Sequence, residues 1–307
     1  MHDLIIIGAG PAGITAGVYA ARQNLDFLLL SRDIGGQAAW SGQIGNYTGY
    51  QLISGPELVE KFQEHMRQYN IALKENESAE RIFALEDAFS VQTDKAQYQG
   101  RSVIIATGKR SRNLGLAKEE YFRNRGLTYC ATCDGPLFFK KDVAVIGGGN
   151  SALDAAIQLE HIANFVYLVN NTASLGGDAL MRQKVEHSAK VKVMNNANVI
   201  DIKGENFVQA LTIRQLGKEA EIPVSGVFVE IGLVPNSDLM DNLDKNEQGE
   251  IKVDAYNQTN LSGIFAAGDV TDVPEKQIII AAGEGAKAAI SVFKYLARKP
   301  AWADKLP

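Results

Sequence analysis

Two glycine-rich stretches, each directly after an apolar run, constrain the fold of this chain more than any other feature. The first, LIIIGAGPAGITAGVYAA, covers residues 4–21, and the second, VAVIGGGNSALDAAIQL, covers residues 143–159. In each, the apolar run predicts a strand, the glycines a tight turn, and the small residues a closely packed helix. The helix start offers unpaired N–H groups and a positive dipole end to a phosphate. A single such turn is also compatible with a strand–helix corner that binds nothing, but two of them favour two dinucleotide-binding α/β domains.

Small residues occupy the positions where a bound pyrophosphate would approach the backbone. In the first turn the predicted cofactor-binding residues are Gly8, Gly10, Pro11, Ala12 and Gly13. In the second they are Gly147, Gly149, Asn150, Ser151 and Ala152. Enzymes with two nucleotide sites are typically flavoproteins that accept hydride from a nicotinamide.

Two further apolar strands that end in glycine indicate how the domains are arranged along the chain. They are SVIIATG at residues 102–108 and GIFAAGD at residues 263–269. Asp269 follows its strand, where α/β folds bind ligands, so its carboxylate can accept hydrogen bonds from sugar-like hydroxyls or cap the next segment. Because the late strand resembles the first half, we expect a discontinuous first domain, residues 1–111 and 243–307, around a second domain at 112–242.

The stretch TYCATCDGPLF, residues 128–138, contains Cys130 and Cys133, the only cysteines among 307 residues. A structural zinc needs four ligands, and the four histidines are scattered, so we predict no metal site. A disulfide that closes so short a loop removes little entropy from the unfolded chain. Redox chemistry is the remaining interpretation. The thiolate is the reactive form of a cysteine, and a position at the start of a helix would lower the pKa of the thiol. Asp134 is the adjacent acid–base candidate, or a helix cap.

Composition narrows the classes of partner. A net charge of −5 gives no basic surface for nucleic acid, and no apolar run is long enough to span a membrane. The N-terminus enters a strand almost at once, so we expect no signal peptide. Two cysteines do not form a secreted disulfide framework, which favours a cytoplasmic location.

Residues 54–74 have apolar side chains at helical spacing, at Leu58, Phe62, Met66 and Tyr69. Ser54 and Glu57 form a capping box at the start of this predicted helix. The segment is expected to be a structural helix with a solvated charged face.

Taken together, these stretches resemble the low-molecular-weight thioredoxin reductases. The resemblance is carried by GAGPAG (8–13), GGQ (35–37), NYTG (46–49), ATG (106–108), YCATCDGP (129–136), GGGNSA (147–152), GLVPN (232–236) and AAGDV (266–270). The tail KQIIIAAGEGAKAA (276–289) is similar to the flavoprotein component of alkyl hydroperoxide reductase. The resemblance implies two Rossmann-like domains of the class II pyridine nucleotide-disulfide oxidoreductase type, and a homodimer.

The resemblance also implies site residues. FAD would occupy the first site and NADH or NADPH the second, with Cys133 facing the flavin and Cys130 as the interchange thiol that attacks a separate thioredoxin-like partner. The domains of this family rotate relative to one another, with hinge candidates near residues 111–114 and 241–244. Further FAD-binding residues would be Gly35, Gly36, Gln37, Asn46, Ala106, Thr107, Gly108, Gly268, Asp269, Gln277 and Ile278. Where many FAD sites have a glutamate, the chain offers Ser31 and Arg32, and Trp302 would cover the flavin or anchor the tail.

The chain departs from the family at the segment that selects the electron donor. After FVYLV (165–169), NADPH-dependent relatives carry arginines for the 2′-phosphate, whereas NNTASLGG (170–177) has no charge. Three donors remain open: NADH through Asn170 or Asn171, NADPH held weakly through Arg182, and ferredoxin. The similarity to the peroxide-reductase flavoprotein favours NADH.

Two other classes of function remain as alternatives. One is a flavoprotein that reduces a small molecule or serves a peroxiredoxin system, with incidental cysteines. The other is a flavin-bound sensor that registers redox state without turnover. Replacing Cys130 by serine distinguishes the first, because disulfide reduction would stop while flavin reduction continued.

Overall fold

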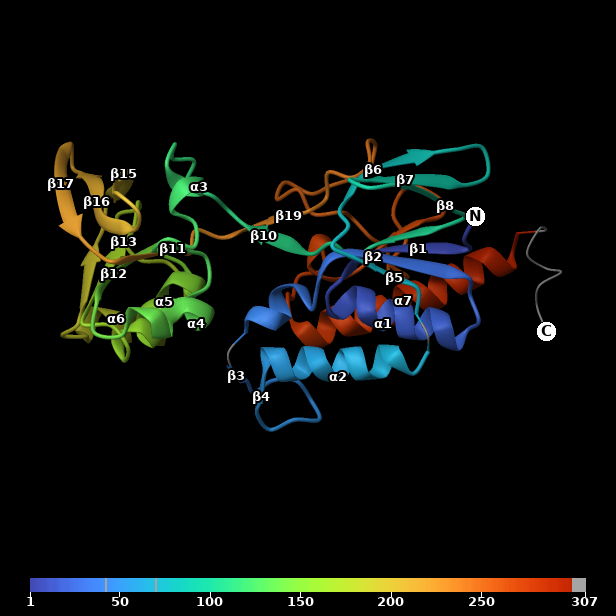
Figure 1. The fold of residues 1–307 in the computed structure, drawn as a ribbon, viewed down its shortest axis with the longest axis horizontal. Helices are drawn as coiled ribbons and strands as arrows, with labels where there is room; N and C mark the ends of the chain where they lie inside the picture. The colour runs from blue at the N-terminus through green and yellow to red at the C-terminus, as the bar shows by residue number, and fades with distance from the viewer. Residues whose placement is uncertain (42, 70, 300–307) are drawn as a thin grey trace. The chain divides into compact units, whose positions relative to one another are not determined.

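The computed structural model describes residues 1–41, 43–69 and 71–299, without the side chains of residues 40, 43 and 133. Trp302 lies outside the described residues. The chain divides into two compact units (Figure 1). The larger unit comprises Met1–Arg110 together with the segment from Val234 onward, and the smaller unit comprises Ser111–Leu233.

The larger unit is built on a parallel five-stranded sheet with strand order β20-β9-β1-β2-β5. Its strands are β1 (Leu4–Ala9), β2 (Phe27–Ile34), β5 (Leu73–Glu75), β9 (Val103–Ile105) and β20 (Ile264–Ala266). The first glycine-rich stretch forms β1, a turn and α1 (Pro11–Arg22). Since β20 pairs with β9, the chain returns to this sheet after building the smaller unit.

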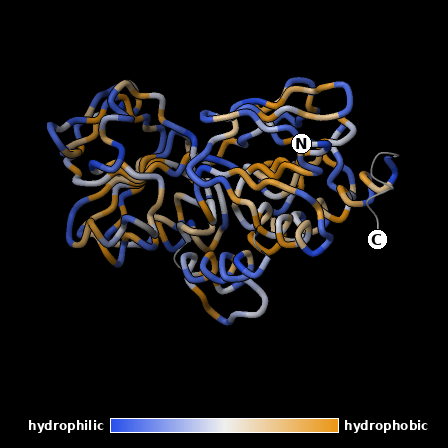
Figure 2. Tube along the Cα trace, turned by 45° about the vertical axis from the view of Figure 1, so that its right-hand side comes forward, coloured by the Kyte–Doolittle hydropathy of each residue, from blue (hydrophilic) through white to orange (hydrophobic). Residues whose placement is uncertain are grey.

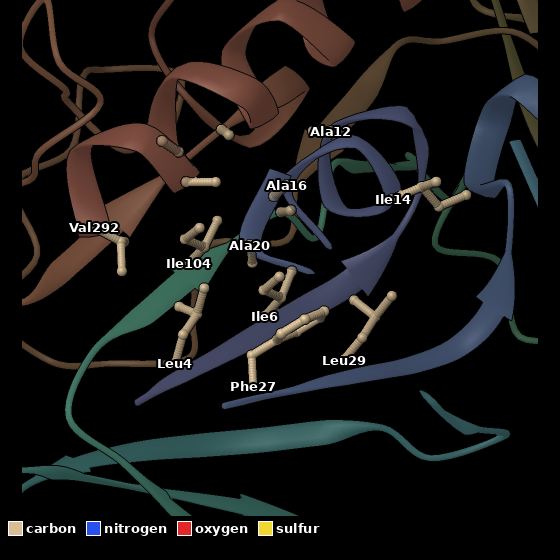
Figure 3. Close-up of a cluster of buried hydrophobic side chains, with 14 of the residues drawn as sticks. Leu4, Ile6, Ala12, Ile14, Ala16, Ala20, Phe27, Leu29, Ile104 and Val292 are labelled. Atoms are coloured by element: carbon tan, nitrogen blue, oxygen red, sulfur yellow. The ribbon is translucent and has the colours of Figure 1, made fainter. Parts of the chain in front are cut away.

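Different layers cover the two faces of this sheet. Leu4 and Ile6 pack toward α1 and α7 (Ile278–Ala297), in the core shown in Figure 3. The intervening Ile5 and Ile7 belong to a second core with residues of a three-stranded antiparallel sheet, as the period of two in a strand requires. That sheet consists of β6 (Ala79–Ala84), β7 (Phe89–Thr93) and β8 (Gln97–Gly100). Figure 2 shows hydrophobic segments concentrated in the central strands and polar segments along outer loops.

Shorter elements complete the larger unit. They are η1 (Gly36–Trp40), β3 (Gln43–Ile44), β4 (Ile53–Ser54), α2 (Gly55–Arg67) and η3 (Gly268–Val270). The predicted capping box is confirmed: the Ser54 side chain accepts from the Glu57 N–H, and the Glu57 side chain accepts from the Ser54 N–H. The helix ends at Arg67, earlier than the predicted segment, because β5 begins at Leu73 and extends the parallel sheet.

The smaller unit repeats the same plan. Its parallel sheet has the order β11-β18-β12-β13-β14, with helices on one face and an antiparallel sheet on the other. The parallel strands are β11 (Leu127–Thr128), β12 (Asp142–Ile146), β13 (Phe165–Val169), β14 (Val191–Met194) and β18 (Gly226–Val229). The antiparallel strands are β15 (Ala197–Gly204), β16 (Val208–Gln215) and β17 (Lys218–Pro223). The helices on the first face are α4 (Ala131–Asp134), η2 (Gly135–Phe138), α5 (Asn150–Glu160) and α6 (Ala179–His187), whereas Phe122 of α3 (Glu119–Phe122) belongs to the core on the side of the antiparallel sheet. The predicted fold class, two Rossmann-like domains with the first one discontinuous, is confirmed.

The chain passes between the units through β10 (Lys109–Ser111) and β19 (Leu233–Pro235), which form a two-stranded sheet. The return to the larger unit falls at 233/234, earlier than the expected 242/243. Residues 234–242 group with the larger unit because they are bonded to it: Asn236 N–H donates to Gly108, and Ile82 N–H donates to Leu239. Across the described residues, none of the helices has both the length and the apolar character needed to traverse a bilayer.

Candidate active site

The glycine turn after β1 is closely packed at two of its three glycines. A Cβ on Gly13 would lie 1.7 Å from the Gly8 oxygen, and one on Gly8 would lie 2.4 Å from the Ala106 oxygen. Gly10 differs, because nothing lies within 4 Å of its Cβ position. Gly10 is also the N-cap of α1, which has no side-chain cap and begins with Pro11 and Ala12. The start of α1 therefore combines uncapped N–H groups with open space beside Gly10, an arrangement that fits a phosphate of FAD.

Several of the predicted flavin residues surround this turn. A Cβ on Gly36 would lie 3.5 Å from Gly10 Cα, so the Gly35–Gln37 segment passes beside the turn. Gln37 Nε2 donates to the Lys109 oxygen at 3.1 Å. Two loop residues far apart in sequence also meet, because Asn46 Nδ2 donates to Gln277 Oε1 at 2.9 Å.

The other predicted flavin residues follow strands β9 and β20 or begin helix α7. Thr107, after β9, donates through Oγ1 to the Asn236 oxygen at 2.7 Å, and Gly108 has a φ of 60°. Gly268 has a φ of 77° at the start of η3. Ile278 begins α7 and packs on the apolar cluster of Ile44, Ile53 and Leu58.

Ser31 has a structural task in this fold. Its buried hydroxyl accepts from the Ala9 N–H at 3.0 Å and donates to the Asp33 oxygen at 2.5 Å. The hydroxyl group thus stabilises the turn after β1. Its single O–H is already donated to Asp33, so it cannot donate to a ribose. Arg32 is exposed and forms an ion pair with Asp33 at 3.4 Å.

Buried charges surround Asp269, which lies in η3 directly after β20. Burial raises the pKa of Asp269, while nearby Lys276 and Lys109 oppose the rise. Both lysines bind Glu250, with Nζ–Oε1 distances of 2.7 Å from Lys109 and 3.1 Å from Lys276. Burial alone would raise the pKa of Glu250, but these lysines and Asn246 outweigh it and lower the pKa to about 2. The carboxyl edge of this sheet therefore holds two cations anchored by one carboxylate.

The second glycine turn, after β12, has the same construction. Gly147 has a φ of 142°, and a Cβ there would lie 2.2 Å from the Glu230 oxygen. Nothing lies within 4 Å of the Cβ position of Gly149, the uncapped N-cap of α5. In the first turn of α5, Asn150 Oδ1 accepts from the Asp178 N–H at 2.7 Å. Ser151 is exposed and Ala152 is buried.

The uncharged loop after β13 is organised by Asn170, which is only 2% exposed. Its Nδ2 donates to the oxygens of Thr172 and Ser174, and its Oδ1 accepts from Thr172. With its side chain fully engaged, Asn170 has a structural role, whereas Asn171 is exposed. Arg182 Nη1 donates to the Leu175 oxygen at 3.3 Å.

The redox stretch lies at the carboxyl edge of the same sheet. Cys130 is disulfide-bonded, and Cys133 is the only other cysteine in the sequence. The side chain of Cys133, and with it the prediction that it faces a flavin, lies outside the described part of the structure. Thr128 Oγ1 donates to Asp134 and accepts from the Cys130 N–H. Asp134 makes no side-chain cap to η2, so its carboxylate is held by Thr128 instead.

The family model described as pyridine nucleotide-disulphide oxidoreductase matches residues 2–285. The chain belongs to this family. An alkyl hydroperoxide reductase component of Escherichia coli is 39% identical over 305 residues, which cover 97% of this chain and 58% of that protein. A protein named NADH dehydrogenase from Bacillus subtilis is 38% identical over 300 residues, which cover 96% of this chain and 59% of that protein.

Among solved structures, thioredoxin reductase from Lactococcus lactis is similar, with a TM-score of 0.85 and 34% identity. The match covers 96% of this chain and 99% of that one. By contrast, the chain spans a little over half the length of the two sequence relatives.

Sequence reasoning missed one group that this family member places beside its disulfide. Glu230 directly follows β18, and its carboxyl group accepts a hydrogen bond from the Ala131 N–H. Burial raises the pKa of Glu230 to about 7, and the nearby charge of Asp154 adds to the rise. The sequence pattern that could have indicated Glu230 is an acidic residue directly after a buried parallel strand, because ligands bind at the carboxyl edge of such a sheet. In the described residues, no group of three or more metal-ligating side chains is close enough to hold a metal ion.

Proposed function

We propose that the chain is an FAD-dependent disulfide reductase that takes electrons from NADH and passes them, through Cys130 and Cys133, to the disulfide of a thioredoxin-like protein. One observation carries this proposal: the single cysteine pair, disulfide-bonded at Cys130, shares a unit with the second of two uncapped glycine turns. The thioredoxin reductase and peroxide-reductase names of the relatives support the same reaction class.

FAD fits the larger unit. Its phosphates would meet the open space beside Gly10, the ribitol chain would bond Asp269, and Asn46 with Gln277 would line the ring system. When bound, FAD supplies a two-electron acceptor that links a hydride donor to a disulfide. The anchored Lys109 and Lys276 place positive charge at this edge, which stabilises electron-rich groups there.

The cysteine pair performs the exchange itself. Two electrons break the Cys130–Cys133 bond, and with one proton the products are one thiol and one thiolate. The Cys130 thiolate then attacks the partner's disulfide, displaces one of its sulfurs as a thiolate and forms a mixed disulfide. Asp134, which accepts a hydrogen bond from Thr128, would supply or take the proton.

NADH is the proposed donor because the loop at residues 170–178 lacks a cation for a 2′-phosphate. Asn170 is buried and fully bonded, so Asn171 is the exposed amide for the ribose hydroxyls. Arg182 is bonded to the Leu175 oxygen and lies beyond this loop. The NADH dehydrogenase name of one relative agrees with this choice.

The same uncharged loop supports a second candidate, a reductase that receives electrons from ferredoxin. In that case the second glycine turn would not bind a nicotinamide donor. The first candidate is preferred because the turn keeps its open Gly149 position and its uncapped helix start.

The test is anaerobic stopped-flow reduction of the FAD-loaded protein by NADH, NADPH or reduced ferredoxin, followed by addition of an oxidised thioredoxin. We expect NADH to bleach the flavin at least tenfold faster than NADPH. Cys130→Ser would bleach equally fast but reduce no thioredoxin. Fast reduction by NADPH would contradict the choice of donor, and unchanged thioredoxin reduction by Cys130→Ser would contradict the whole proposal.

A further inference from the structure

The two residues between the cysteines are each held by a side chain of the smaller unit. The Ala131 N–H donates to the carboxyl group of Glu230. Thr132 Oγ1 donates to Gln158 Oε1 at 3.0 Å, and Gln158 Nε2 donates to Asp154 Oδ2 at 3.0 Å. The Glu230 carboxyl group thus bonds the backbone of the redox loop, and the Asp154 carboxyl group on α5 is linked to the Thr132 side chain through Gln158.

Glu230 is fixed by its backbone as well as by its side chain. Its N–H donates to the Ile146 oxygen at 2.8 Å, which extends the pairing of β18 with β12. The main-chain oxygen of Glu230 lies so close to Gly147, in the second glycine turn, that a Cβ on Gly147 would be 2.2 Å from it. The residue therefore stands between that turn and the redox loop, and its carboxyl group bonds the peptide that joins Cys130 to Ala131.

We propose that Glu230 is a positioning residue for the redox pair, whose carboxyl group holds the loop and sets the proton affinity of the Cys130 thiol. The inference deepens the proposed function and rests on it, because it concerns the same disulfide. A negative charge at the Cys130–Ala131 peptide disfavours a second negative charge on the Cys130 sulfur. The ionisation of Glu230 and that of the Cys130 thiol are therefore coupled, because a negative charge on either group raises the pKa of the other.

Other ionisable groups near this edge have separate partners. Asp134 is held by Thr128, and the Tyr129 hydroxyl donates to Glu119 at 2.6 Å, with Arg123 over the Tyr129 ring. Asp142 lies at the opposite, amino end of β12. Asp154 is the charged side chain that adds to the raised pKa of Glu230. Glu230 thus titrates near neutral pH, in the range where thiol exchange proceeds.

The consequence concerns proton uptake on reduction. When two electrons from a dithiol or from reduced flavin break the Cys130–Cys133 bond, one proton yields a thiol and a thiolate, and a second yields two thiols. With Glu230 ionised, the Cys130 sulfur holds its proton more tightly, so the second proton is retained to higher pH. With Glu230 neutral, the thiolate forms more readily.

The experiment measures the Cys130 thiol directly, without flavin or donor. In a Cys133→Ser background, kept reduced with a phosphine, the alkylation rate of Cys130 by iodoacetamide is followed from pH 5 to pH 10 by mass spectrometry. Glu230→Gln keeps an acceptor for the Ala131 N–H but removes the charge. We expect its thiol pKa to fall by about one unit, with alkylation at pH 7.5 faster by about tenfold. Glu186→Gln, an exposed change on α6, is the matched control and should behave as the parent.

Asp154→Asn provides a second test that does not alter the contact with Ala131. It should move the Glu230-dependent step of the profile to lower pH, and it decides the matter if Glu230→Gln fails to fold by circular dichroism. Overlapping alkylation profiles for the parent, Glu230→Gln and Asp154→Asn would overturn the proposal. That result would leave the proposed function intact, because disulfide reduction by the FAD-loaded protein is measured separately.

Discussion

Lys109 Nζ lies 2.7 Å from Glu250 Oε1 although the two residues are 141 positions apart in the sequence. Both side chains are nearly buried, with exposures of 13% and 11%, and Lys276 completes the cluster. Removing the shared carboxylate leaves two largely buried lysines without their direct ion-pair partner, which is costlier than losing a surface ion pair.

We therefore expect Glu250→Gln to destabilise the protein by about 1–3 kcal/mol at pH 7. The folded-state pKa of Glu250 is about 2, below its ordinary value of 4.5, so its ionisation stabilises the fold above pH 4.5. That contribution is lost as the pH falls through 2. Urea unfolding at pH 7 and pH 3 should show a smaller difference between variant and parent at the lower pH. The exposed Glu86→Gln is the control, and an equal effect of both changes would contradict the prediction.

The two open glycines allow ligand binding to be separated from folding. A Cβ at Gly10 or Gly149 meets nothing within 4 Å, so Ala at either position should cost less than about 1 kcal/mol in stability. Gly10→Ala should lose FAD, because the methyl group fills the space for a phosphate. Gly149→Ala should keep FAD but be reduced by NADH at least tenfold more slowly. Flavin absorbance per protein and stopped-flow bleaching measure these effects, and full flavin retention by Gly10→Ala would argue against the assigned site.

Adjacent asparagines should differ in their effects. Asn170→Ala removes the hydrogen bonds that this buried side chain makes to Thr172, Ser174 and Asn195, and should cost about 1–3 kcal/mol of stability. Asn171→Ala should leave the melting temperature unchanged and raise KM for NADH about fivefold, the value of one hydrogen bond. Thermal unfolding and steady-state kinetics separate the two. If Asn171→Ala had the kinetics of the parent, Asn171 would not contact the donor.

The raised pKa of Glu230 also predicts how stability depends on pH. Because its folded-state pKa is about 7 and its ordinary value is 4.5, the folded state retains a proton that the unfolded state loses. This contribution is full below pH 4.5 and is lost as the pH rises through 7. Glu230 is half-buried, so we expect about 1–3 kcal/mol at most. Glu230→Gln should flatten the stability profile between pH 5 and pH 8, measured by chemical denaturation, and an unchanged slope would contradict this assignment.

Local patterns predicted the parts of the molecule that depend on local geometry. The two glycine turns and the Ser54 capping box follow from short-range spacing, and both form as expected. The structure divides the units at 233/234 and not at the expected 242/243, because distant contacts that no local pattern records hold residues 234–242 in the larger unit.

The electrostatic partners needed the three-dimensional structure. Glu250, Lys109 and Lys276 come from three separate segments, and no periodicity links them. The position of Ser31 after a strand suggests a ribose ligand, but its hydroxyl is used by Ala9 and Asp33. Asn46 and Gln277, which the family resemblance indicated, do meet, although their sequence separation is 231.

The paired strands β10 and β19 have a practical consequence. Arg112 N–H donates to the Gly232 oxygen and Asn236 N–H donates to the Gly108 oxygen, so the two crossings run side by side. The inserted unit can therefore be excised and residue 110 joined to residue 234 by a short peptide, which adds little loop-closure entropy. The two units then become separate polypeptides, and the binding of FAD and of NADH to each can be measured by calorimetric titration.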